Sequence, residues 1–238
     1  MIVPLDFDGP DQFVWAGQIA KLSVPARAAW AAFCVGTVGP LLPPSFHARF
    51  PFGRCVRAAW DFALGRPFDR DEVERLHERL VYEAAVFGQA GTDDDNPGYW
   101  MLVEHYRLTH PSAPGYLLEL VLNPDNSEYA AESAVEAAGL VYKDYQFWRQ
   151  GYHDVADEAY PYVGAVLNMF YDMTQRAHAV ALAHAGEPTE EMFAGVEFPA
   201  DCAPLAPDLA AASRLNPGPT TALQEQWLRE TGRWRGPA

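Results

Sequence analysis

The side chains best able to do chemistry lie close together in residues 145–162, YQFWRQGYHDVADEAYPY. His153 stands four residues from both Arg149 and Asp157, and a histidine beside a carboxylate can transfer protons. Aromatic side chains line many ligand pockets, and helix bundles build such pockets between facing helices. One interpretation is therefore a pocket of an enzyme or a small-molecule-binding protein. It would be lined by Trp100, His105, Tyr145, Trp148, Arg149, Tyr152 and His153.

The same run also fits an ordinary packed helix. Residues at intervals of three and four form one continuous stripe, which is typical of a helix face in a core. The stripe consists of Val141, Tyr145, Trp148, Tyr152, Val155 and Ala159. Arg149, His153 and Asp157 then share a flank and can pair as a ladder of charges. A polar pocket or partner surface built by these three residues and Glu158 remains the alternative.

No set of residues has the spacing of a metal site. Glu74 and His77 form one E-x-x-H pair, but di-iron helix bundles that use this pair need a second copy. The seven histidines show no zinc-binding spacing, and the three cysteines form no C-x-x-C arrangement. We therefore predict no metal site.

The motifs of nucleophilic and nucleotide chemistry are missing as well. The sequence has no G-x-S-x-G elbow, no G-x-G-x-x-G and no Walker A loop. Cys34 and Cys55 stand among apolar residues, which predicts buried and unreactive thiols. Asp93, Asp94 and Asp95 precede Asn-Pro-Gly, a pattern of exposed turns rather than of magnesium-binding helices. We predict no cofactor, and we expect a binding protein more than an enzyme.

Charge is distributed unevenly along the chain, whose net charge is −15. Residues 108–213 hold 16 acidic residues and only Lys143, Arg149 and Arg176 as bases, a net charge of −13. Such a field repels nucleic acid and anionic membranes and attracts basic proteins. Solubility alone is the other interpretation of this charge. The lack of a long apolar run, of a signal-peptide pattern and of a disulfide framework favours a cytoplasmic protein.

Helical periodicity predicts an all-α fold, a single compact bundle of seven to nine helices with Pro-rich connections, over residues 1–238. Ser23 is the expected N-cap of a helix that ends at Gly39-Pro40, and Asp69 or Asp71 begins another. Pro111 and Pro114 are expected to break the chain, and Asp125 with Glu128 resembles a capping box. Expected ends of helices lie at Gly65, Arg149 and Gly186. We expect an arm at 1–8, an irregular segment at 187–219 and a frayed tail at 233–238.

Two segments of the first third, ARAAWAAFCVGTVGPLLPPSF and GRCVRAAWDFALGRP, carry a resemblance to a known group. An Ala-rich helix ends at Leu42-Pro43, and the next helix holds Arg57-Ala58-Ala59 and Trp60 before Gly65. This pattern resembles the opening of the all-helical immunity proteins of bacterial polymorphic toxin systems. The later YAAESAVEAAG is similar to an alanine-rich helix of that group. The resemblance implies an immunity function and assigns no binding residue.

Acidity and the missing catalytic motifs together favour a cytoplasmic protein that binds and neutralises a basic protein, with immunity to a bacterial toxin as its most specific form. We expect no nucleic-acid or membrane partner. The predicted contact residues are all carboxylates: Asp93, Asp94, Asp95, Asp125, Glu128, Asp144, Asp154, Asp157 and Glu158. The aromatic and histidine-lined pocket remains the alternative function.

Overall fold

The computed structural model describes residues 16–42, 47, 50–88, 111–149, 160–184 and 186–196. These residues form helices and turns, and no strand occurs among them, so the prediction of an all-α fold is confirmed. In the described part of the chain, no helix combines the length and the apolar character that crossing a membrane requires.

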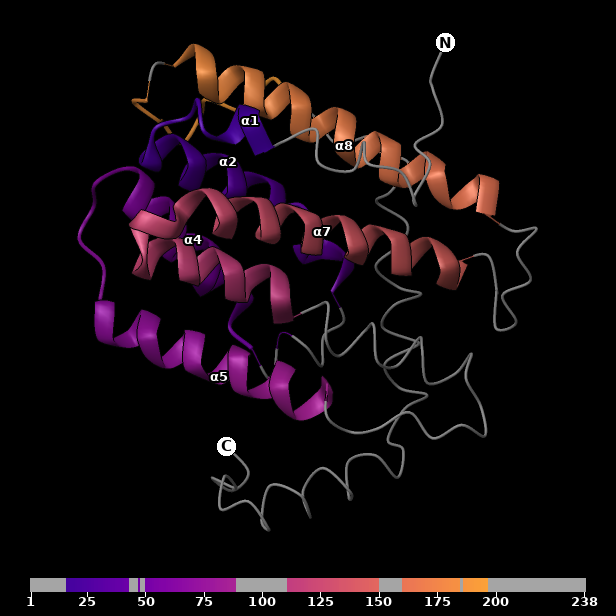
Figure 1. Cartoon of the computed structure of the whole chain (residues 1–238), viewed down its shortest axis with the longest axis horizontal. Coiled ribbons are helices and arrows are strands. Elements are labelled where there is room, and N and C mark those ends of the chain that lie inside the picture. The colour runs from indigo at the N-terminus through magenta and orange to yellow at the C-terminus, as the bar shows by residue number, and fades with distance from the viewer. Residues whose placement is uncertain are drawn as a thin grey trace.

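The helices of the described ranges stack in layers (Figure 1). α8 (Tyr160–Ala183) lies along one side, next to α7 (Ser127–Arg149), and both contact α2 (Val24–Gly36). α4 (Phe52–Ala63) packs on α2, and α5 (Arg70–Gly88) forms the opposite edge. Residues 111–122 are also helical. Three short elements complete the order: α1 (Ala16–Ile19), and the 3₁₀ turns η2 (Gly39–Leu41) and η3 (Pro124–Asn126).

Several helix ends follow the local signals of the sequence. The Ser23 hydroxyl accepts a hydrogen bond from the Ala26 N–H at 3.3 Å, and the Asp69 carboxylate accepts one from the Glu72 N–H at 3.0 Å. Both are N-caps, as predicted. Gly65 has φ of 64° just after α4, the left-handed conformation in which helices often end.

Other boundaries differ from the prediction. α2 ends at Gly36, because the Thr37 backbone N–H closes the last turn, and Gly39-Pro40 belongs to η2 instead. α7 begins at Ser127 rather than at Asp125, because residues 124–126 form a separate 3₁₀ turn. Pro111 and Pro114 were expected to break the chain, but residues 111–122 are helical without interruption.

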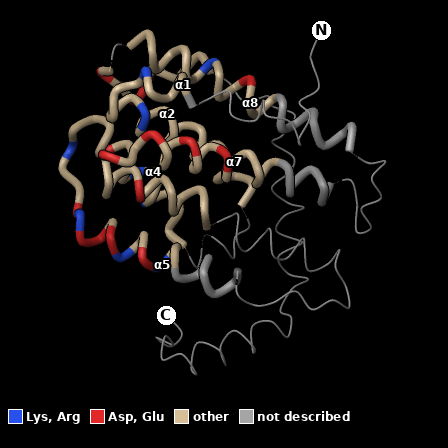
Figure 2. Tube along the Cα trace, viewed as in Figure 1, with Lys and Arg blue, Asp and Glu red and all other residues tan. Residues whose placement is uncertain are grey.

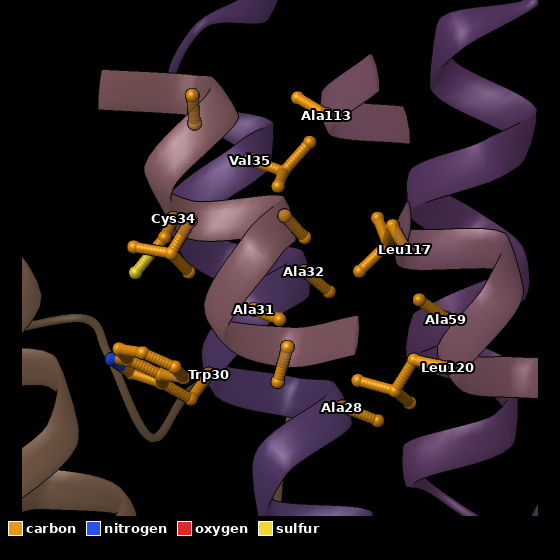
Figure 3. Packing of buried hydrophobic residues seen from close by; sticks show 14 of the residues in the cluster. Ala28, Trp30, Ala31, Ala32, Cys34, Val35, Ala59, Ala113, Leu117 and Leu120 are labelled. Carbon is orange, nitrogen blue, oxygen red and sulfur yellow. The ribbon is translucent and has the colours of Figure 1, made fainter. Parts of the chain in front are cut away.

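The core centres on α2, whose alanines let neighbouring helices approach closely. Ala28, Ala29, Ala31 and Ala32 are fully buried. Leu117 and Leu120 lie on one side of α2 and Trp30 on the other (Figure 3). The Trp30 indole Nε1 donates a hydrogen bond to the Thr174 backbone oxygen of α8 at 3.0 Å. Trp30 is fully buried, so this bond gives its only polar side-chain atom a partner. Small side chains on one helix and one large anchor thus define the packing around α2.

Candidate functional site

Carboxylates with raised pKa values lie next to one another along one side of α7. The inner side of this helix is buried and small, with Ala130, Ala131, Ala134 and Ala138 at 0% exposure. The residues at 128, 132 and 136, each one helical turn after the last, lie on the side of α7 away from that stripe and are half-buried. We call Glu128, Glu132 and Glu136 the carboxylate row; Figure 2 shows acidic residues recurring along this part of α7.

One arginine stands at the beginning of the row. The Arg27 guanidinium donates to the backbone oxygens of Ile19 at 3.1 Å and Ala20 at 3.2 Å. It also donates to the Ser127 hydroxyl at 3.0 Å and lies 4.0 Å from the Glu128 carboxylate. Arg27 therefore joins α1, α2 and α7, and its charge compensates only the first glutamate.

The second and third glutamates stand next to one another without such compensation. Burial, followed by the negative charge of Glu128, raises the pKa of Glu132 above its usual range. Burial, followed by the charge of Glu132, likewise raises the pKa of Glu136. Among the described residues neither carboxylate forms an ion pair, and the Glu132 Oε1 is buried with no hydrogen-bond partner. A cation placed beside them would therefore stabilise the ionised form of both carboxyl groups.

Three tyrosines border the carboxylate row. Tyr129 is 57% exposed, and its ring meets that of Tyr116 edge to face, with centroids 6.2 Å apart. Burial raises the pKa of Tyr116, and so do the neighbouring Tyr129 and Glu136. Burial and the charge of Glu136 raise the pKa of Tyr171 to about 12. Tyr116 and Tyr171 therefore stay neutral. Tyrosine side chains supply hydrogen-bond donors and flat apolar surface beside the carboxylates.

This arrangement suits binding rather than bond-breaking chemistry. Carboxylates in a row accept charge-assisted hydrogen bonds from arginine and lysine, and tyrosine rings can stack against a guanidinium. Burial raises the pKa of the Cys55 thiol to about 12 and that of Cys34 well above its usual range, so both thiols stay protonated, as expected.

Of the predicted site residues, only Asp125 and Glu128 have described side chains. Asp125 is exposed in η3, one turn before Glu128, so the two lie at the same end of α7. Four more belong to α7, although their side chains are outside the described part: Asp144, Tyr145, Trp148 and Arg149. The remaining predicted residues lie outside the described ranges altogether: Asp93, Asp94, Asp95, Trp100, His105, Tyr152, His153, Asp154, Asp157 and Glu158.

The E-x-x-H pair of α5 does not form. His77 Nε2 lies 3.2 Å from the Glu119 carboxylate of residues 111–122, and Glu74 instead accepts from Arg70 at 3.1 Å. The histidine thus has a carboxylate partner on another helix. No group of three potential metal ligands occurs in the described part of the chain.

Sequence reasoning did not single out Glu132 and Glu136. The signal was present in YAAESAVEAAG, where glutamates recur every four residues and are otherwise surrounded by small residues. Like charges at this spacing are neighbours on a helix and destabilise it. This repeated unfavourable spacing was therefore the sequence signal for the carboxylate row.

Comparison with known proteins adds no assignment: no protein-family model matches the chain, and no curated protein or solved structure shows a significant match to it.

Proposed function

We propose that this protein binds a basic partner protein through the carboxylate row of α7 and neutralises it. The observation that carries the proposal is the alignment of Glu128, Glu132 and Glu136, of which only the first has a described cation beside it. Lysines or arginines of a partner would supply the missing counter-charges. Immunity to a basic bacterial toxin is the most specific form of this function, and the resemblance of the first third of the chain supports it.

The tyrosines give the proposed surface its affinity. Carboxylates raise the association rate by steering a basic protein, whereas aromatic side chains in the centre of an interface contribute most of the binding energy. Tyr129 and Leu140, which are 57% and 38% exposed, flank the row on the same helix. A partner with arginines set around an apolar centre fits this combination.

The test compares two variants of equal net charge. E128Q/E132Q/E136Q neutralises the row, and E74Q/E78Q/E187Q neutralises three exposed glutamates elsewhere. Each is mixed with a panel of purified, catalytically inactivated basic toxin domains, and association rates are measured at about 0.05 M and about 0.3 M salt. For the domain that binds the natural protein, the row variant should associate at least about tenfold more slowly at low salt.

The control variant should retain most of the association rate. Equal losses in both variants would show that total charge, and not the row, attracts the partner. A tight complex that is indifferent to the row variant and to salt would contradict the proposal.

A further inference from the structure

A second feature, remote in sequence from the carboxylate row, is the segment that follows α8. We call residues 187–196 the strap. Gly186 has φ of +90°, and a Cβ at this position would lie 2.7 Å from the Ser23 hydroxyl oxygen. A glycine is therefore needed where the chain turns off the end of α8 and passes the beginning of α2.

The strap covers an aromatic surface on α2 and α4. Met192, Phe193 and Val196 are buried, although the strap itself contains only turns. The Phe193 ring stacks on Phe33 of α2 with centroids 4.6 Å apart, and it meets Trp60 of α4 at 6.0 Å. The strap thus inserts one aromatic anchor between two helices.

Charged groups fix the strap three residues before that anchor. The Glu190 carboxylate accepts a hydrogen bond from Arg66 at 2.5 Å and lies 3.8 Å from Arg57. The hydrogen bond and the charge of Arg66, with a smaller contribution from Arg57, lower the pKa of Glu190. The Asp61 carboxylate of α4 lies 4.0 Å from Arg57 and 3.9 Å from Arg66. The two arginines therefore keep a counter-charge when the strap is absent.

The backbone of the strap is held separately from the helices beneath it. Within the described residues, the N–H groups of Met192, Ala194 and Val196 donate to oxygens three residues earlier in the strap. The Glu187 N–H donates to His184 at the end of α8. Side chains alone therefore attach the strap to α2 and α4, as in a complex of a short peptide with a helical surface.

We propose that Phe33, Arg57, Trp60 and Arg66 form a peptide-binding surface and that the strap is its intramolecular ligand. The ligand class follows from the occupant: a short segment with a carboxylate three residues before an aromatic residue, as in Glu190-Glu-Met-Phe193. A partner segment of this kind binds when it displaces the strap. This inference is independent of the carboxylate row, so either proposal can fail without the other.

A labelled peptide with the sequence of residues 187–196 tests the proposal on the full-length protein by fluorescence anisotropy. The natural protein should bind it weakly, because a tethered strap competes at an effective concentration on the order of millimolar. Phe193→Ala removes the anchor and should tighten peptide binding at least about tenfold. A peptide with alanine in place of its phenylalanine should not bind, and F193A/R66E should lose most of the gain.

Loss of the buried Phe193 can also weaken folding, so a second opened variant is needed. Glu190→Arg changes a side chain that is 51% exposed and removes only the ionic attachment. It should also bind the peptide more tightly than the natural protein does. Circular dichroism verifies that each variant is folded. If folded E190R and the natural protein bind the peptide equally, or if adding R66E to F193A leaves its affinity unchanged, the strap is a fixed part of the fold and the proposal is wrong.

Discussion

Replacing Glu132 with glutamine should stabilise the folded protein. Glu132 has a like charge one helical turn away on each side, at Glu128 and Glu136. Each such pair costs about 0.2–0.5 kcal/mol at low ionic strength, so Glu132→Gln should raise the free energy of unfolding by about 0.4–1 kcal/mol. For a chain of this size, this corresponds to a melting temperature about 1–4 °C higher.

The stability gained by Glu132→Gln should depend on pH. The pKa of Glu132 is raised in the folded protein, first by burial and then by Glu128, so the folded state holds its proton at a higher pH than the unfolded state. As the pH rises through this window, ionisation in the folded state lowers the stability. Glutamine cannot ionise. The gain should therefore be present at neutral pH and absent below about pH 4, where the glutamate is protonated in both states.

Thermal unfolding at neutral and acidic pH, in low salt and in about 1 M salt, measures these differences. Glu187→Gln is the matched control, because Glu187 is exposed, outside α7 and without an ion pair among the described residues. It changes the net charge equally and should leave the melting temperature nearly unchanged. A neutral or destabilising E132Q, or a gain that persists in acid and in high salt, would refute the electrostatic reasoning.

Two predictions concern the packing, and urea denaturation measures both. Gly186→Ala should destabilise by about 1–3 kcal/mol, because it strains a φ of +90° and crowds Ser23, whereas Gly53→Ala in α4, with open space around it, should be neutral or stabilising. Equal effects of the two substitutions would contradict this account. Trp30→Phe should cost about 1–3 kcal/mol through lost volume and the lost hydrogen bond to Thr174. A loss near zero would mean that the indole is not the anchor between α2 and α8.

Local chemistry made several helix ends predictable from the sequence. Ser23 and Asp69 cap helices because their side chains reach a backbone N–H three residues ahead, which requires no knowledge of the rest of the fold. Gly65 and Gly186 adopt positive φ where a side chain would be strained. The all-α class followed from the same local periodicity.

Contacts between distant segments could not be read from spacing. His77 lies 3.2 Å from the carboxylate of Glu119, which stands on another helix, and the spacing of Glu74 and His77 does not indicate this partner. Phe193 packs on Phe33 and Trp60 although it follows α8 in sequence, and a Pro- and Ala-rich composition indicated only an irregular segment. Such contacts depend on which helix faces are brought together, and this is decided by the whole core.

The position of the acidic residues favours our proposal of a binding surface over solubility alone as the reason for the charge. Solubility requires negative charge on the surface but no particular order, and it is served equally well by carboxylates that avoid one another. Glu128, Glu132 and Glu136 instead stand one turn apart, where each lowers the stability of the next. The exposed arginines Arg57 and Arg66 are engaged by Asp61 and Glu190 and not by the row. Arg27 lies beside Glu128 alone, so the repulsion between Glu132 and Glu136 stays uncompensated among the described residues, which supports our proposal that a basic partner neutralises the row.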